Sequence, residues 1–258
     1  MKTITSRENP LFKNVKKLAT TAKERRKTGQ TLLDGIHLVS AYREAGGLPE
    51  AVLVAASARK NQEIGDFLAE TPAANLIVLN DELFREISTV ETPTGIAALI
   101  RVPVPVAAEG GDCRVLLEDI QDPGNLGSIL RSAAAAGIGR VYLSTGCADA
   151  WSPKVMRAGM GAHFHLSIYE HSDLAQIARD FSGEVVATIP HAENSLFDLD
   201  LRGVVAFVIG NEGAGISAQL LETARSRVTI PMPGVVESLN AAAAAAICFF
   251  ERVRQVGA

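Results

Sequence analysis

The second half of the chain alternates short apolar runs with longer segments of helical periodicity. The expected strands are 114–118, 140–143, 163–168, 184–189, 204–209 and 227–230, and the expected helices are 126–136, 154–160, 173–181, 217–224 and 239–254. Several of the runs are apolar throughout, as strands are when helices cover both faces of a parallel sheet. The alternation therefore predicts a mostly parallel α/β sheet over residues 113–258.

A smaller pattern of the same kind precedes it. Apolar runs at 31–33, 51–55, 76–79 and 95–100 alternate with helical patterns at 37–45, 61–69 and 81–87. The segment 103–112 has prolines in its first half and paired glycines near its end, which is typical of a linker. We expect a basic helical arm at 1–30, a small α/β domain at 31–102, the linker at 103–112 and the larger α/β domain at 113–258.

Charge is unevenly distributed along the chain. Residues 1–30 carry nine Lys or Arg against two Glu, a charge of 9 − 2 = +7, although the whole chain carries −4. Such a local excess can attract phosphates in a protein that is acidic overall. A solvated helix face has the same composition, so both interpretations stay open. The same two alternatives apply to Arg59 and Lys60, while His37, alone beside a helix start, is expected to be structural.

The sequence also indicates where in the cell the protein is expected. No apolar run reaches the roughly 20 residues needed to cross a bilayer, and the first 17 residues lack the apolar core of a signal peptide. Cys113, Cys147 and Cys248 are few and scattered, which favours a reducing compartment. We expect a cytoplasmic protein that is not membrane-bound.

Metal chemistry is not expected. His163 and His165 would alternate on a strand, without a nearby Cys or acidic ligand set. His171 and His191 are isolated, and both are expected to be structural or surface residues.

Three loops at expected strand ends carry polar side chains. The first has a Pro-Gly turn with Asn125 at the mouth of a helix and Arg131 nearly two turns later, and we expect both on one side of that helix. The second, 210–215, places three glycines around Glu212. The third, 231–240, leads to Ser238 and Asn240, either of which can cap the last helix.

Each loop alone is also compatible with a simple turn. Strand ends of a parallel sheet meet at one edge, however, where open α/β folds bind ligands. The chain has neither G-x-G-x-x-G nor G-x-x-x-x-G-K-[ST], which disfavours a nicotinamide-dependent oxidoreductase and a P-loop enzyme.

Together the three loops read D-P-x-N-x-G-x-x-x-R at 122–131, G-N-E-x-x-G at 210–215 and I-P-M-x-x-x-x-x-S-L-N at 230–240. With these motifs in this order, the chain resembles the SpoU (TrmH) family of S-adenosylmethionine-dependent RNA ribose 2′-O-methyltransferases, in the SPOUT superfamily. The resemblance covers about 112–254. Residues 30–99 resemble, more loosely, the family's L30e-like substrate-binding domain.

The resemblance implies a knotted (trefoil) domain, a homodimer with its active site near the subunit interface, and S-adenosyl-L-methionine as cofactor. The catalytic residues it implies are Asn125, Arg131, Glu212, Ser238 and Asn240. The cofactor-binding residues it implies are Thr188, Gly210, Asn211, Gly213, Ile230, Met232 and Leu239. The substrate it implies is structured RNA, which we expect to be ribosomal. Transfer RNA, or a non-catalytic RNA-binding protein that keeps the fold, are the alternatives.

The family mechanism centres on Arg131, in some accounts as the base. A guanidinium with a pKa above about 12 is a poor proton acceptor at pH 7. We therefore expect Arg131 to stabilise negative charge or position a phosphate. Asn125 and Asn240 would orient Arg131 or the ribose. Glu212 would pair with Arg131 or anchor its loop, and Ser238 would bind substrate or cap the helix.

Overall fold

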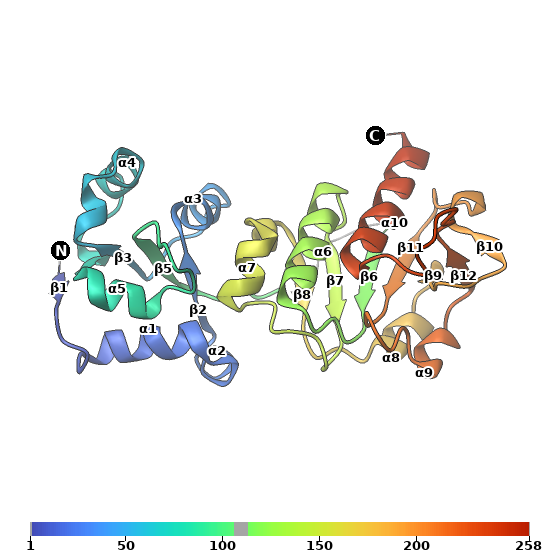
Figure 1. Cartoon of the computed structure of the whole chain (residues 1–258), viewed down its shortest axis with the longest axis horizontal. Coiled ribbons are helices and arrows are strands. Elements are labelled where there is room, and N and C mark those ends of the chain that lie inside the picture. The colour runs from blue at the N-terminus through green and yellow to red at the C-terminus, as the bar shows by residue number, and fades with distance from the viewer. Residues whose placement is uncertain (1, 106–112, 258) are drawn as a thin grey trace. The chain divides into compact units, whose positions relative to one another are not determined.

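The structure, a computed structural model, describes residues 2–105 and 113–257 and divides into two compact units (Figure 1). Unit 1 holds residues up to Pro103 together with Trp151–Phe164, and unit 2 holds Val104–Ala150 and the chain from His165 onward. Most of the predicted linker, residues 106–112, lies outside the described residues.

Unit 1 is built on a five-stranded sheet of order β1-β4-β3-β5-β2. Its strands are β1 (Lys2–Ile4), β2 (Gln30–Asp34), β3 (Ala51–Ala55), β4 (Leu76–Leu79) and β5 (Ile96–Arg101). Strand β5 runs antiparallel to both of its neighbours. The helices are α1 (Pro10–Thr20), α2 (Ala22–Thr28), α3 (Ile36–Glu44), α4 (Gln62–Ala69), α5 (Asp81–Ile87) and α7 (Pro153–Gly159), with 3-10 turns η1 (Ser57–Lys60), η2 (Ala73–Asn75) and η3 (Ala162–His165).

The basic N-terminal segment is part of the core of unit 1, not a separate arm. Strand β1 pairs with β4, and α1 buries Phe12, Val15 and Leu18. The helical arm expected at 1–30 contains two helices, α1 and α2, because the backbone is extended at Thr21 between them. Apolar spacing alone did not reveal this break.

Residues 151–164 differ from the prediction that placed them with the larger sheet. They lie in sequence between two strands of the larger sheet, β7 (Arg140–Leu143) and β8 (Ser167–Tyr169), but pack in unit 1. Trp151 is buried there, and Thr31 Oγ1 donates a hydrogen bond of 2.7 Å to its carbonyl oxygen. The expected strand at 163–168 is also wrong over 163–166, because the strand begins at Ser167. Positive φ angles at Met160 and Gly161 turn the chain, and both histidines fall in η3.

Unit 2 confirms the predicted parallel sheet, with seven parallel strands in the order β10-β12-β9-β11-β6-β7-β8 (Figure 1). Its strands are β6 (Cys113–Leu117), β7 (Arg140–Leu143), β8 (Ser167–Tyr169), β9 (Glu184–Thr188), β10 (Asn194–Ser195), β11 (Val205–Ile209) and β12 (Ser226–Thr229). Its helices are α6 (Pro123–Ala135), α8 (Leu174–Arg179), α9 (Ala218–Leu221) and α10 (Ala241–Val256), with a 3-10 turn η4 (Leu196–Asp198).

Successive side chains of β11 point to opposite faces of this sheet and contact helices on both. Phe207 meets Phe249 of α10, with ring centroids 5.7 Å apart, and α10 packs beside α6. Ala206 and Val208 point to the other face, where they join a cluster with Leu220 of α9. The strand is buried at every position, so its carboxyl end and the loop that follows are held firmly. No helix in the described ranges is long and apolar enough to cross a bilayer.

Candidate active site

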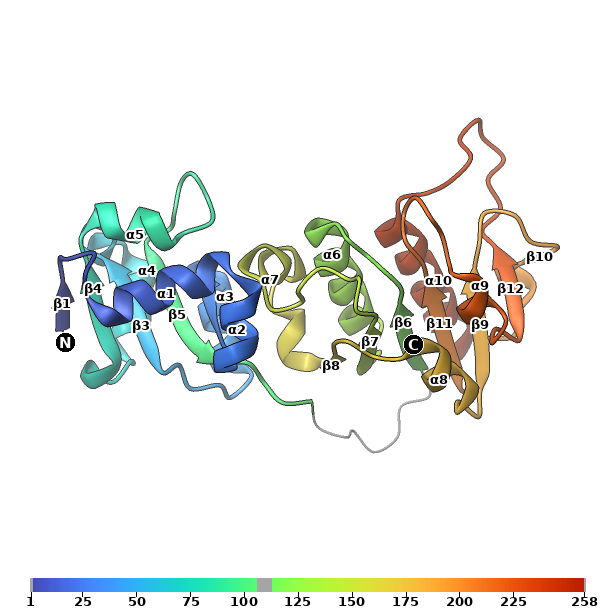
Figure 2. The ribbon, with the colours of Figure 1, turned by 90° about the horizontal axis from the view of Figure 1, so that it is seen from below.

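A cavity of about 350 Å³ opens in unit 2 where β9, β11 and β12 end. Four segments line it, within residues 188–191, 209–216, 229–232 and 237–244. The last of these spans the end of the long connection from β12 to α10, which Figure 2 shows, and the first turn of α10. All seven residues expected to hold the cofactor line the cavity: Thr188, Gly210, Asn211, Gly213, Ile230, Met232 and Leu239. This is the edge of a parallel sheet where open α/β folds bind ligands.

The loop after β11 is closed into a tight turn. Asn211 and Gly215 exchange two backbone hydrogen bonds of 3.0 Å. A Cβ atom on Gly210 would lie 2.5 Å from the backbone of Gly215 and 2.7 Å from Ile216. Only glycine fits at position 210, which explains the residue on packing grounds and leaves its backbone open to close approach by a ligand.

Asn211 holds this loop in place with its side chain. Its Oδ1 accepts hydrogen bonds of 2.8 Å from the backbone N–H groups of Gly213 and Ala214, and its Nδ2 donates to the carbonyl of Asp119 at 2.8 Å. The amide therefore ties the loop to the segment after β6. Asn211 lines the cavity, but its polar groups are committed to the loop, so its contribution to a ligand site is to position the backbone.

Three of the expected catalytic side chains form one hydrogen-bonded chain. Asn240 Nδ2 donates to Asn125 Oδ1 at 2.9 Å, and Asn125 Nδ2 donates to Glu212 Oε1 at 2.7 Å. Asn240 is also the N-cap of α10, since its Oδ1 accepts from the N–H groups of Ala242 and Ala243. The chain joins the three loops that the sequence predicted to converge. Glu212 accepts from Asn125 rather than pairing with Arg131.

Arg131 and Ser238 take different places. Ser238 lines the cavity with Glu212. Arg131 is exposed on α6, does not line the cavity, and has no hydrogen bond or ion pair to any residue that the structure describes. The expectation that it shares one side of the helix with Asn125 is wrong. Six residues at about 100° each place two side chains about 120° apart around the axis.

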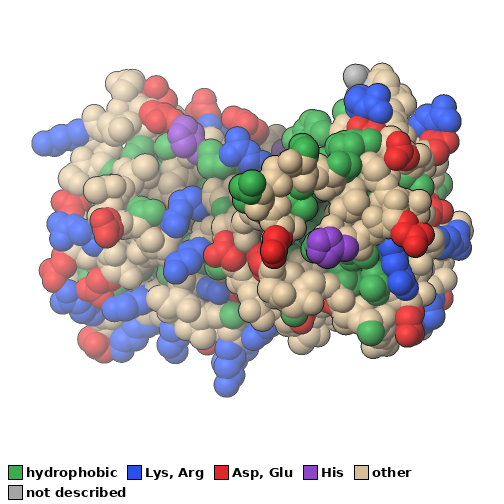
Figure 3. Space-filling view, turned by 45° about the vertical axis from the view of Figure 1, so that its right-hand side comes forward, with side chains coloured by type: hydrophobic (Ala, Val, Ile, Leu, Met, Phe, Trp, Pro, Cys, Tyr) green, Lys and Arg blue, Asp and Glu red, His purple; other side chains and the backbone are tan. Residues whose placement is uncertain are grey.

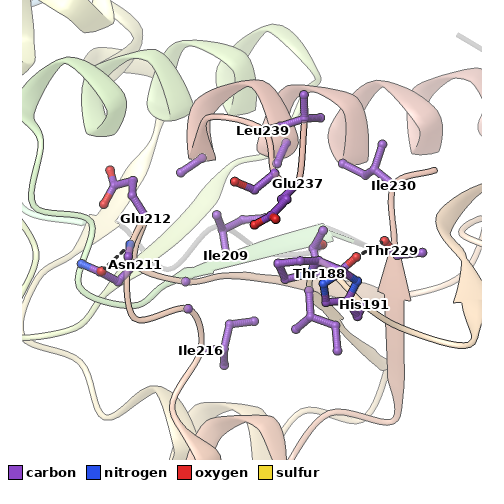
Figure 4. A pocket seen from close by; sticks show the side chains of 18 of the residues that line it. Thr188, His191, Ile209, Asn211, Glu212, Ile216, Thr229, Ile230, Glu237 and Leu239 are labelled. Atoms are coloured by element: carbon purple, nitrogen blue, oxygen red, sulfur yellow. Dashed lines mark hydrogen bonds between the residues drawn. The ribbon is translucent and has the colours of Figure 1, made fainter. Parts of the chain in front are cut away.

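Two cavity residues were not expected in the site. His191, interpreted as structural or surface, lines the cavity three positions after Thr188. Glu237 lines it as well, one position before the expected Ser238. Figure 4 shows His191 near Thr188 and Thr229 on one side of the cavity, with Glu212 on the opposite side and Glu237 between them. For His191 the available signal was its place just after a strand. For Glu237 it was its place within the third motif.

The lining fits a cationic ligand with an apolar ring. Ile209, Ile230 and Leu239 supply apolar surface, and Glu212 and Glu237 supply two carboxylates. None of the described lining residues is Lys or Arg. An adenine ring with a sulfonium matches this set. A dinucleotide with an anionic pyrophosphate does not, because bringing like charges together without a cation is costly.

A buried thiol supports the cavity from behind Thr188. The Thr188 hydroxyl lies 3.3 Å from Cys248 Sγ on α10. Burial raises the pKa of Cys248 to about 11, so that thiol is protonated at pH 7. Cys248 is therefore a packing residue and not a nucleophile. Across residues 2–105 and 113–257, no three His, Cys, Asp or Glu side chains gather as metal ligands do.

The amide chain can be tested at its centre. Asn125→Ala removes the hydrogen bonds to Glu212 and Asn240 together. For the methyl transfer that the family resemblance implies, we expect about a tenfold lower rate, because each lost hydrogen bond contributes about 1 kcal/mol and a charged one more. The free energy of unfolding should fall by no more than about 2 kcal/mol, measured in urea. Gln176→Ala, which removes exposed hydrogen bonds to Asp180, is the control and should leave the rate unchanged. An unaltered rate in Asn125→Ala would contradict a role for the hydrogen bonds that link Asn240, Asn125 and Glu212.

Two family models match the chain. Residues 112–250 match the SpoU rRNA Methylase family, and residues 9–98 match the MRM3-like substrate binding domain. Among curated proteins, the chain is 36% identical to an uncharacterized tRNA/rRNA methyltransferase of Synechocystis, covering 98% of this chain and 93% of that protein. It is 34% identical to the 23S rRNA (guanosine(2553)-2′-O)-methyltransferase RlmP of Bacillus subtilis, covering 97% and 98%.

Solved structures agree over the same length. An RNA 2′-O ribose methyltransferase superposes with a TM-score of 0.83 at 32% identity, covering 98% of both chains. The SpoU methyltransferase AviRb of Streptomyces viridochromogenes, in complex with the cofactor AdoMet, superposes with a TM-score of 0.87 at 28% identity, covering 96% of this chain and 98% of that one. On its fold, its three loops and these matches, the chain belongs to the SpoU rRNA methylase family.

Proposed function

We propose that this protein transfers a methyl group from S-adenosyl-L-methionine to a ribose 2′-hydroxyl of ribosomal RNA. The observation that carries the proposal is the cavity in unit 2, lined by two carboxylates and apolar side chains, with the Asn240–Asn125–Glu212 chain at its edge. Relatives described as 23S rRNA guanosine-2′-O-methyltransferases support the reaction and the substrate class. Transfer of labelled methyl groups from the cofactor to RNA tests it.

The cofactor-binding role falls to the cavity residues. Ile230 and Leu239 offer apolar surface to an adenine ring, and the Gly210 backbone allows close approach. Thr188, Met232 and Gly213 complete the proposed set, with Asn211 holding the loop. When bound, the cofactor supplies an electrophilic methyl group on a sulfonium. Calorimetry should find binding of S-adenosyl-L-methionine and not of NAD; the reverse result would favour an oxidoreductase.

The protein must align the 2′-hydroxyl and stabilise charge as it loses its proton. The site would hold the 2′-hydroxyl against the methyl group that the bound cofactor supplies, and the hydroxyl proton would leave to a neighbouring RNA phosphate. Arg131 is exposed and has no anionic partner among the described residues, so its charge is available to that phosphate or to the developing alkoxide. The Asn125 chain orients Glu212, and Ser238 offers the ribose a hydroxyl.

Basic side chains of unit 1 would bind the RNA backbone. Figure 3 shows Lys and Arg gathered over the region of α1 and α2. Arg7, Lys13 and Lys16 are paired with glutamates there. Lys17, Lys23, Arg26 and Lys27 are exposed and have no anionic partner among the described residues. These four cations are the ones available to phosphates.

Salt dependence measures their contribution. Replacing Lys23, Arg26 and Lys27 by alanine should lower the slope of log K against log salt by about 2 to 3, since each phosphate contact contributes about 0.7–0.9. Removing three exposed arginines elsewhere, in Arg101→Ala, Arg179→Ala and Arg202→Ala together, is the charge-matched control and should change the slope by less than 1. Fluorescence anisotropy with labelled ribosomal RNA fragments gives both slopes. Equal slopes in the two triple variants would contradict this binding surface.

We also propose that the active form is a homodimer. Phe250 and Val256 on α10 are 47% and 44% exposed, and Leu239 at the cavity edge is 37% exposed. A second copy would cover this apolar surface. Light scattering should give twice the chain mass of 27.3 kDa, and a monomer at micromolar concentration would exclude the dimer.

Two further features belong to the proposal, a trefoil knot and a cytoplasmic location. The trefoil knot would close the cavity by passing the C-terminal segment through a preceding loop, and an experimentally traced backbone tests that path. A cytoplasmic location is consistent with the free cysteines Cys113, Cys147 and Cys248. Recovery of the protein outside the soluble cytoplasmic fraction would contradict it.

A further inference from the structure

Unit 1 has a cavity of its own, of about 310 Å³, at the carboxyl ends of β3 and β4. It is lined by residues from three segments: 55–61 at the end of β3, 81–85 in α5, and 93–95 just before β5. Its volume falls at the small end of the range for ligand pockets, about 300–1,000 Å³. The residues proposed above to bind RNA phosphates belong to other segments, so this cavity has no role yet.

The shape of this cavity depends on close backbone packing. Gly95 has a φ of +92°, which L side chains rarely adopt, and a Cβ atom there would overlap the Cβ of Ala58. Phe84 is only 1% exposed and forms an apolar wall. Glycine at position 95 lets residues 93–95 lie against η1, which closes one side of the cavity. The cavity is thus part of the packed fold of unit 1.

A carboxylate and an amide face this space with hydrogen-bonding capacity to spare. Asp81 Oδ1 accepts from the Ser57 N–H at 3.1 Å and from Ser57 Oγ at 2.8 Å. Oδ2 accepts no hydrogen bond within the described residues. Asn61 Oδ1 accepts from Ile64 N–H at 3.3 Å, so its NH₂ group is left to donate. The two hydrogen bonds from Ser57 lower the pKa of Asp81, which is therefore an ionised acceptor at pH 7.

The rim of the cavity is cationic. Arg85 lines it, and Arg59 and Lys60 lie in η1 between the lining residues Ala58 and Asn61. All three side chains are exposed, and no hydrogen bond or ion pair joins them to another described residue, although the charge of Arg85 helps to lower the pKa of the nearby Asp81. Glu82 and Glu86, the acidic residues of α5 beyond Asp81, are paired with Arg7 and Lys16. The free charge beside the cavity is therefore positive, which suits phosphates on either side of a bound base.

We propose that this cavity binds one unpaired nucleotide of the RNA substrate, with guanine as the preferred base. The inference rests on the proposed function, because it takes RNA to be the substrate. Sequence-specific proteins read RNA mainly at unstacked bases, through their hydrogen-bonding edges. Guanine presents two adjacent N–H donors for the Asp81 carboxylate and a carbonyl oxygen for Asn61 or Arg85. Uracil presents a single N–H on this edge. Adenine and cytosine have an acceptor nitrogen in place of the ring N–H, so all three bases fit less well.

The experiment uses the full chain, with the cavity of unit 2 filled by S-adenosylhomocysteine. The single-stranded trinucleotides AGA, AUA, ACA and AAA are titrated while backbone amide resonances are followed by NMR. We expect AGA to shift the amides of residues 57–61, 81–85 and 94–95 and to bind about tenfold more tightly than AAA or ACA. Asp81→Asn and Arg85→Ala should each weaken AGA by about tenfold, as loss of one charged hydrogen bond does.

Arg101→Ala, an exposed arginine of the same unit outside the cavity, is the matched control and should leave AGA binding unchanged. Equal affinity for the four trinucleotides, shifts confined to other residues, or unaltered binding in Asp81→Asn and Arg85→Ala would each overturn the assignment. The readout needs no catalysis. AGA binding in a protein that fails to methylate would leave this site standing, whereas methylation without these shifts would remove it and keep the proposed function.

Discussion

Replacing Arg131 with alanine should abolish most methyl transfer and leave cofactor binding intact. The guanidinium is exposed, does not line the cavity and has no hydrogen bond or ion pair with a described residue, so its loss should not disturb the cavity loops. Loss of one group that stabilises transition-state charge costs about 10²–10³ in rate. Single-turnover rates with saturating RNA, together with calorimetric titration of S-adenosyl-L-methionine, measure the two effects separately.

Arg131→Lys serves as the control for charge. Lysine keeps the positive charge but lacks the planar fork of arginine, so partial activity is expected if a phosphate is positioned by two parallel hydrogen bonds. Arg179→Ala, an exposed arginine on α8 of the same unit, should retain the full rate. Normal methylation by Arg131→Ala would remove this residue from the mechanism. A parallel loss of cofactor affinity would show that it acts on the cavity instead.

The second large effect is expected at Gly210. An added Cβ atom would lie 2.5 Å from the Gly215 backbone, so Gly210→Ala must push the turn apart. Overpacking of this kind costs about 1–3 kcal/mol, and the displaced backbone is the cavity wall. We expect the Kd for S-adenosyl-L-methionine to rise about tenfold to a hundredfold, measured by calorimetry.

Gly203→Ala is the matched control, because a Cβ atom at Gly203 has no neighbour within 4 Å. It should leave the Kd unchanged. Thermal unfolding of both variants shows whether Gly210→Ala is still folded at the titration temperature. A folded Gly210→Ala protein with the original Kd would mean that the cofactor binds elsewhere.

Local patterns in the sequence predicted much of this fold. Strands such as β3, β4 and β7 appear at the expected residues, because each is a short apolar run bounded by polar or glycine residues. Strands β1 and β10 were not expected. They are three and two residues long, which is too short for a periodic signal, and they exist because a neighbouring strand offers hydrogen bonds.

Long-range packing was beyond the sequence patterns. Nothing local to residues 151–164 shows that Trp151 will be buried in unit 1. In the site, motif spacing predicted that three loops converge, and Asn240, Asn125 and Glu212 do form one chain. The spacing did not reveal which pairs form. Helix geometry turns Arg131 away from Asn125, and the partner of Glu212 is therefore an amide.

The most direct test of the central claim is the chemical position of the transferred methyl group. Total ribosomal RNA from cells that lack this gene is incubated with the protein and methyl-labelled S-adenosyl-L-methionine, then hydrolysed with alkali. A 2′-O-methyl group blocks cleavage at its own phosphodiester, so the label should appear in alkali-resistant dinucleotides. Label in mononucleotides, which indicates base methylation, or no label in RNA at all, would contradict the account.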